Sequence, residues 1–291
     1  MTDLYALAIA PFVDYSFMRR ALVASLALSL GSGPVGVLLM LRRMSLIGDA
    51  MSHAVLPGAA VGFLVAGLSL WGMTFGGIVA GLAVALGAGL VSRNTVLRED
   101  ATFAGFYLTS LALGVLIVST HGSNIDLLHI LFGTILAIDN AALFLVGTIA
   151  SVSTVVLLAI YRPLILECFD PAFLRAIGAR GSVYHLLFLI LVVLNLVAGF
   201  QALGTLMAVG LMMLPAATAR FWADDVWTMA VISIAVAFAS GFLGLIVSYR
   251  FGLPSGPAIV LTASVFYVVS ILAGKRGSVA SRRVRARHVT G

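Results

Sequence analysis

A carboxylate and an imidazole lie four residues apart, as Asp49 and His53, in the segment L-I-G-D-A-M-S-H-A-V-L-P-G. If this segment is helical, the spacing places both side chains on one face, one turn apart. A carboxylate oxygen and an imidazole nitrogen at that separation can bind one divalent cation, and zinc, manganese and iron all accept this ligand pair. Pro57 follows one turn later, where we expect it to weaken the helix and free a backbone carbonyl. The pair predicts a metal site.

Other interpretations of the pair stay open from the sequence alone. A buried hydrogen bond between Asp49 and His53 would stabilise a helix bundle without binding any metal. Asp49 also lies near the start of its apolar segment, where a carboxylate complements the helix dipole. Two ligands are fewer than the four or more that metal sites normally use. A second Asp–His pair from a two-fold dimer, or a ligand from another helix, would complete the site.

The composition around the pair is that of a membrane protein. Of 291 residues, 62% are hydrophobic and 10% are charged, whereas a soluble domain carries about a quarter charged residues. A charge at the bilayer centre costs on the order of 3 kcal/mol, so an ionisable residue there needs a role. By the span boundaries given below, we count only Asp49 and His53 as ionisable residues inside the membrane. This composition excludes a soluble enzyme, a soluble nucleic-acid-binding protein and a disordered chain.

The apolar stretches predict an all-α, polytopic helical membrane protein that forms a single transmembrane domain over residues 1–291. A span takes roughly 20 residues, and the continuous apolar runs are unlike the alternating strands of a barrel. A tenth piece, 127–138, is too short to cross and is expected to be a re-entrant segment or half-helix. We predict nine spans, near 18–41, 46–68, 73–92, 102–119, 141–161, 184–201, 203–219, 226–248 and 256–273.

The distribution of positive charge predicts the orientation. Six of the 17 Lys and Arg residues lie in the basic tail 275–291, which is expected to face anionic lipid in the cytoplasm rather than a nucleic acid. Counting nine spans back from a cytoplasmic tail puts fourteen positive residues inside and three outside, with the N-terminus outside. If 127–138 crossed the membrane, the four arginines Arg42, Arg43, Arg93 and Arg98 would lie outside. The charge bias therefore favours nine spans.

The longest inside connection, 162–183, contains a helix-start signal. Asp170 is typical of the residue that caps the start of a helix, and Pro171 is typical of the first helical position. Gly178 or Gly181 would end the helix within one or two turns. A short helix at this face is suited to bind a soluble partner. A plain connector lying on the lipid surface fits the same residues.

Other polar residues predict less. His121 and His129 flank an outside loop, where solvated histidines are common. His185 lies at the start of a helix on the inside and is expected to be at the membrane interface. Asn195 and Gln201 are expected to hydrogen-bond between helices. The sequence has no G-x-x-x-x-G-K-[ST] phosphate loop, so ATP hydrolysis would require a separate chain.

Several stretches resemble the membrane permease subunits of ATP-binding-cassette importers for zinc, manganese or iron. The most specific is L-R-R-M-S-L-I-G-D-A-M-S-H-A-V-L-P-G at 41–58. The others, in the expected order, are L-F-G-T-I-L-A-I at 131–138, F-D-P-x-F-x-R-A-I-G at 169–178, M-M-L-P-A-A-T-A-R at 212–220 and L-P-S-G-P-A-I-V-L at 253–261. Together they span most of the chain.

The resemblance implies a homodimeric permease in a bacterial cytoplasmic (inner) membrane, with ATP-binding subunits docked beneath it and an extracytoplasmic metal-binding protein above. Such a chain is a transport subunit and not an enzyme, and its metal ion is cargo rather than a permanently bound cofactor. Asp49 and His53 match the family's metal-pathway positions. The resemblance assigns coupling to the ATPase to the segment that contains Asp170, Pro171, Phe173, Arg175 and Gly178. It assigns no role to the basic tail, nor to the loop around Arg250 and Gly252.

Two rival functions are compatible with the residues. A secondary, proton-coupled divalent-metal carrier would use Asp49 or His53 as a proton relay and would need no ATPase. A structural or signalling membrane protein would keep the pair as a core hydrogen bond, so that replacing either residue would lower folded yield without changing any metal flux per folded molecule. The sequence does not choose among manganese, zinc and iron.

Overall fold

The computed structural model describes residues 9–67, 69–120, 135, 138–176, 178 and 181–280. All regular elements in these ranges are helical, and eight of the helices are long and apolar enough to cross a membrane. The chain is therefore a multi-pass helical membrane protein. The spans are α3 (Ser16–Leu41), the pair α4 (Ser45–Ala54) and α5 (Leu56–Ala66), α6 (Leu70–Asn94), α7 (Glu99–Thr120), α9 (Asn140–Phe169), α11 (Gly181–Leu203), α13 (Val226–Phe251) and α14 (Ser255–Ala273).

Three shorter helices complete the described chain. They are α2 (Ala10–Asp14), α10 (Pro171–Ala176) and α12 (Thr205–Arg220), of which α12 is apolar over Met207–Arg220. Eight of the nine predicted spans coincide with the long apolar helices within a few residues at most ends, and the ninth, 203–219, coincides with the shorter apolar helix α12. One end differs, because α9 continues through Arg162 and Pro163 to Phe169 and so takes the first part of the expected 162–183 loop.

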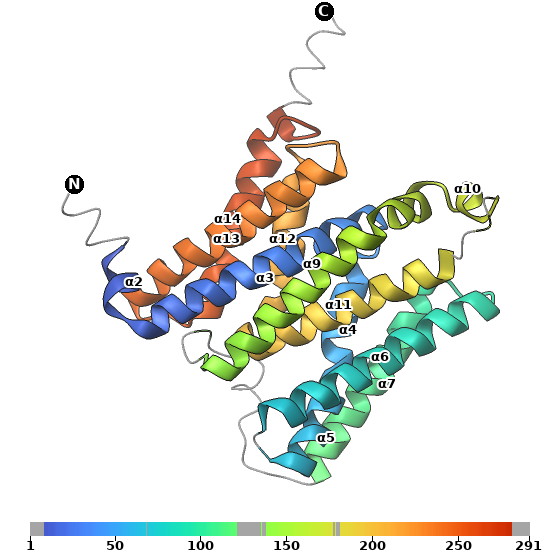
Figure 1. Ribbon diagram of the computed structural model, residues 1–291, viewed down its shortest axis with the longest axis horizontal. Coiled ribbons are helices and arrows are strands. Elements are labelled where there is room, and N and C mark those ends of the chain that lie inside the picture. Colours follow the sequence, from blue (N-terminus) through green and yellow to red (C-terminus); the bar gives the residue numbers. More distant parts are fainter. Residues whose placement is uncertain are drawn as a thin grey trace, which may run out of the picture.

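The helices form three adjoining groups (Figure 1). The helices α3, α9 and α11 lie in the middle, with α12, α13 and α14 on one side and α4 to α7 on the other. Apolar clusters fill both junctions, one around Leu39, Met51 and Val193 and the other around Met18, Leu211 and Ile259. Outward apolar side chains such as Trp71 and Val265 remain exposed, as expected of surfaces that face lipid.

Glycines allow α5 and α6 to pack closely. Gly58 and Gly62 of α5 lie against the backbone of Gly76 and Gly72 of α6, so that a β-carbon at either α5 position would collide with a carbonyl oxygen. In lipid, where helices gain little from apolar burial, such close backbone contact is a main source of association. The small residues in this part of the sequence thus position the α4–α5 segment.

The predicted short piece 127–138 lies almost entirely outside the described residues. The helices that flank it run in opposite directions, because the start of α7 and the end of α9 meet the same cluster of side chains around Arg42. The end of α7 and the start of α9 therefore lie toward the same face of the protein (Figure 1).

Candidate functional site

The helix α4 is packed on one side and open on the other. Ile47 and Met51 are buried, and Gly48 lies against α12, where a β-carbon would come 2.7 Å from Cε of Met213. Met212 also reaches this surface, so both methionines fill space beside α4. The opposite side of α4 carries Asp49, whose side chain is 66% exposed.

The structure brings Asp49 and His53 together on that open face. His53 Nε2 lies 4.0 Å from Asp49 Oδ1, and the imidazole is 34% exposed. The His53 ring stands 6.3 Å from the ring of Tyr107 on α7, and its Nδ1 is buried without a hydrogen-bond partner. A cation with ligand bonds of about 2.1 Å needs the two ligand atoms roughly 3.0–3.4 Å apart, so a small side-chain rotation would let one ion bridge them.

The pair is an incomplete site within one chain. Among the described residues, no group of three or more His, Cys, Asp and Glu side chains is placed to hold a metal ion. Asp49 is nevertheless exposed, so ligands from outside this set can reach it. The arrangement therefore offers half of an ordinary coordination shell, on a face that the described chain leaves uncovered.

The predicted weakness before Pro57 is confirmed as a break between α4 and α5 at Val55. Proline has no N–H to donate, so the helical ladder loses a bond at this point. The carbonyl of Ala54 accepts a hydrogen bond from Ser110 Oγ of α7 at 3.1 Å. Pro57 removes the donor to the His53 carbonyl, one residue before Ala54, so the bond from Ser110 connects the end of α4 to α7 directly beside the break.

The predicted helix start at Asp170 is also confirmed. Asp170 Oδ1 accepts a hydrogen bond from the backbone N–H of Phe173 at 2.9 Å, and α10 begins at Pro171. Gly178 follows with a φ of 76°, a left-handed conformation that favours glycine. Leu174 is buried, whereas the Phe173 side chain is 49% exposed. The side chain of Arg175 lies outside the described set.

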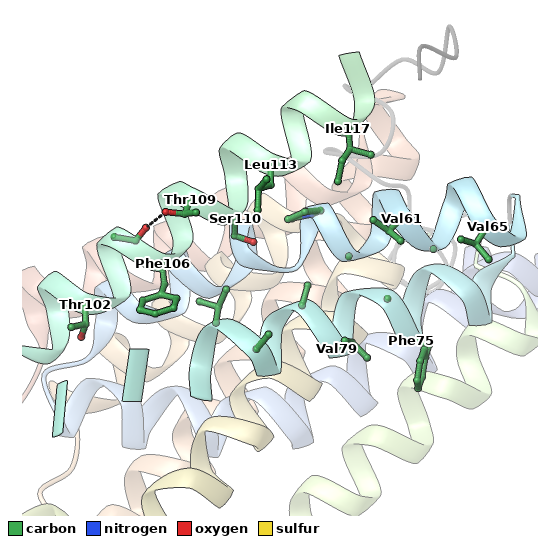
Figure 2. Close-up of a pocket in the computed structure, with 18 of the residues that line it drawn as sticks. Val61, Val65, Phe75, Val79, Thr102, Phe106, Thr109, Ser110, Leu113 and Ile117 are labelled. Atoms are coloured by element: carbon green, nitrogen blue, oxygen red, sulfur yellow. Dashed lines mark hydrogen bonds between the residues drawn. The ribbon is translucent and has the colours of Figure 1, made fainter. Parts of the chain in front are cut away.

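An apolar groove of about 1000 Å³ runs between α5, α6 and α7. Figure 2 shows Val61 and Val65 of α5 and Phe75 of α6 among its lining side chains, with Leu113 and Ile117 contributed by α7. The polar side chains of its lining are hydroxyls, and no carboxylate, imidazole or thiol belongs to it. The groove is therefore suited to apolar chains and not to a metal ion.

Sequence reasoning missed one group of polar residues. We expected His185 to be interfacial, but it is buried and lies beside Arg42, Glu99 and Glu167, which come from three other helix ends. Arg42, Glu99 and His185 stand at or near the ends of predicted spans, which was the one available signal, whereas Glu167 fell within the expected 162–183 loop. His121 and His129 lie outside the described residues. The interhelical roles of Asn195 and Gln201 are confirmed by hydrogen bonds to Ser153 and Thr74.

Comparison with known proteins gives a consistent result over almost the whole chain. The family model of the ABC 3 transport family matches residues 14–274. The manganese import system permease protein ScaB of Streptococcus parasanguinis is 35% identical over 266 residues, which cover 90% of this chain and 94% of ScaB. A probable iron transport system membrane protein of Haemophilus influenzae is 30% identical, over 90% of this chain and 96% of that protein.

A solved structure shares the fold. PsaBC from Streptococcus pneumoniae in complex with Fab contains a chain that matches with a TM-score of 0.82 and 31% sequence identity. The match covers 95% of this chain and 98% of that chain.

Proposed function

The chain belongs to the ABC 3 transport family, and from this premise we propose that it forms the membrane pathway of an ATP-driven importer whose cargo is a divalent transition-metal ion. It is a permease subunit and not an enzyme. ATP hydrolysis belongs to a separate ATP-binding subunit, because the sequence contains no phosphate-binding loop of its own.

The observation that carries the proposal is the open face of α4. A carboxylate and an imidazole stand 4.0 Å apart on a membrane-embedded helix, and the carboxylate is two-thirds exposed. Ionisable side chains in spans are costly, so a pair of them whose carboxylate other helices leave uncovered points to an ion pathway. The exposure argues against a purely structural hydrogen bond, which would be enclosed by the bundle.

We propose manganese as the preferred cargo. A carboxylate is a hard ligand that suits manganese, and the imidazole is accepted by manganese, iron and zinc alike. The relative ScaB is a manganese import system permease protein, and a second relative is a probable iron transport system membrane protein. We therefore expect manganese to be transported in preference to iron. Zinc uptake should be measured beside them, because the same ligand pair also accepts zinc.

A second copy of the chain completes the site in this proposal. One chain offers two ligands, and the described residues contain no further cluster. A two-fold axis beside α4 would bring a second Asp49 and His53 into reach and give four ligands. The pathway between the two copies would then be lined by the α4 faces.

In this proposal, transport proceeds in four steps. An extracytoplasmic binding protein delivers the ion, ATP binding closes the two ATP-binding subunits, and α10 transmits their motion to the spans. Asp49 and His53 bind the ion transiently before the pathway opens inward. Their affinity has to be moderate, because a site that binds too tightly releases too slowly to conduct.

The test is metal-resolved uptake in cells that produce the chain with its partner subunits. Asp49→Ala and His53→Ala should each lower manganese uptake by about tenfold or more, as expected when one of few ligands is lost, while the amount of permease in the membrane stays the same. Leu46→Ala is the matched control, since it truncates a 77% exposed side chain of the same helix that has no ligand atom.

Normal uptake at normal expression in both variants would remove the site assignment. Uptake that is abolished by an uncoupler, but survives inactivation of the ATP-binding subunit, would contradict the ATP-driven function and favour a proton-coupled carrier.

A further inference from the structure

The guanidinium of Arg42 lies at the meeting point of several helix ends. Its Nη2 donates to Glu167 Oε2 at 3.0 Å, its Nη1 lies 2.9 Å from His185 Nδ1, and its Nε donates to Cys168 Sγ at 3.0 Å. The guanidinium carbon stands 4.7 Å from the centre of the Phe188 ring. One side chain from the end of α3 therefore contacts the end of α9 and the first turns of α11.

His185 extends these contacts to a fourth helix. Arginine has only donors, so His185 Nδ1 must accept, and the ring proton lies on Nε2. Nε2 is 3.0 Å from Oε1 of Glu99, the first residue of α7. We call Arg42, Glu99, Glu167, Cys168 and His185 the Arg42 cluster.

The centre of the cluster is enclosed by protein, and its edge at Glu99 is partly open. The side chains of Arg42, Glu167 and His185 are 7%, 14% and 10% exposed, whereas that of Glu99 is 35% exposed. An ion pair at the surface separates easily because water replaces each partner, whereas separating a buried pair leaves two charges without solvent. The four helix ends are therefore expected to move together.

A short turn connects Arg42 to the helix that carries the Asp–His pair. Arg42 ends α3, and α4 begins at Ser45. Between them Arg43 has a φ of 60°, and the N–H of Met44 donates to the carbonyl of Leu39 at 2.9 Å. This hydrogen-bonded turn has little conformational freedom, so a displacement of Arg42 displaces the start of α4.

The opposite side of the cluster contacts the segment that leads to α10. Glu167 lies in the last turn of α9, three residues before the Asp170 cap. A β-carbon at Gly181 would lie 3.2 Å from Cδ2 of Leu174 and 3.7 Å from Cγ of Glu167. Leu174, the buried residue of α10, is thus packed beside the same glycine as Glu167.

We propose that Arg42 is a positioning residue that couples α10 to α4, so that movement imposed on α10 by an ATP-binding subunit reaches Asp49 and His53 through Glu167 and Arg42. This inference rests on the proposed function. It assigns a transmission role to residues that do not contact the cargo, and it predicts a loss of coupling rather than a loss of assembly or binding.

The experiment uses the complete transporter, with its ATP-binding subunits, in liposomes and compares manganese transported with ATP hydrolysed. Arg42→Lys keeps the charge but cannot reach three partners in fixed geometry. We expect manganese transported per ATP to fall by about tenfold, in the range seen for coupling residues, while ATP hydrolysis and the Kd for Mn²⁺ stay within about twofold. Glu167→Gln, which keeps the shape and removes the charge, should give a smaller loss of the same kind.

Arg43→Gln is the matched control, because it removes the charge of the next residue in the same turn, which is exposed, and it should keep the wild-type ratio. Three results would overturn the proposal: an unchanged ratio in Arg42→Lys and Glu167→Gln, a weaker Kd for Mn²⁺ in both, or failure of both to assemble with the ATP-binding subunit. A wild-type complex that transports no manganese would instead contradict the proposed function.

Discussion

Asp49 and His53 differ in how the chain surrounds them, and the difference suits transient binding. Asp49 is open to the uncovered face of α4, whereas one nitrogen of His53 is buried near Tyr107 and the other points toward Asp49. The imidazole is thus partly enclosed by the protein, whereas the carboxylate is open. An ion bound on such a partly open face can leave again, as conduction requires.

Ser110 of α7 stabilises the end of α4, directly beside the break between α4 and α5. Its hydroxyl donates to the Ala54 carbonyl from the neighbouring helix. Ser110→Ala should lower the free energy of unfolding by about 1 kcal/mol, because interhelical hydrogen bonds in membranes contribute about that much. The measurement is unfolding of the purified permease in mixed micelles by SDS titration.

Thr109→Ala is the control for this loss, since the Thr109 hydroxyl bonds to Gly105 within its own helix. Equal destabilisation by the two substitutions would show that the bond from Ser110 to Ala54 has no special role.

At the scale of elements, the sequence predicts helices better than it predicts how their ends meet. Hydropathy finds each span, because the transfer of a continuous apolar run into lipid outweighs local propensity. The α10 helix is also predictable, because the Asp170-Pro171 pair is a local signal. The end of α9 is not, since Arg162 and Pro163 resemble the start of a loop. The Arg42 cluster is not predictable either, because each of its charges is acceptable only once the others are folded around it.

Phe173 tests the assignment of α10. About half of its side chain is exposed beside the buried Leu174, so the ring is available to a partner. Phe173→Ala should lower the affinity of the permease for its ATP-binding subunit by about tenfold or more, as is usual for an aromatic anchor. Co-purification and titration of the two subunits measure the effect, and the folded yield of the permease should not change.

Phe251→Ala provides the comparison, because Phe251 is 74% exposed at the end of α13, away from α10. Full assembly and full transport in Phe173→Ala would exclude α10 as the coupling element.

At the scale of the whole molecule, the orientation in the membrane is a prediction from the distribution of positive charge. The positive charges of the sequence are concentrated in the connections on one side. In the structure, the ends of α3 and α9 and the starts of α7 and α11 lie together around Arg42, which is one of the positive residues counted on that side. The proposed orientation therefore has α10 inside and the turn between α13 and α14 outside.

Cysteine labelling tests this orientation. The chain has one cysteine, so a Cys168→Ser variant that still transports is a suitable background. Leu253→Cys, in the turn between α13 and α14, should react with a membrane-impermeant maleimide on intact cells. Val96→Cys, a fully exposed position between α6 and α7, should react only after permeabilisation. The reverse pattern would invert the proposed topology.

The central claim is that the imidazole of His53 binds the transported ion, and electron spin-echo spectroscopy of bound Mn²⁺ tests it most directly. The purified transporter, labelled with ¹⁵N-histidine and loaded with Mn²⁺, should show a nitrogen coupling from a histidine ligand. That coupling should disappear in His53→Gln and persist in the wild-type protein. A histidine coupling that survives in His53→Gln, or Mn²⁺ bound to the wild type without any histidine coupling, would contradict the account.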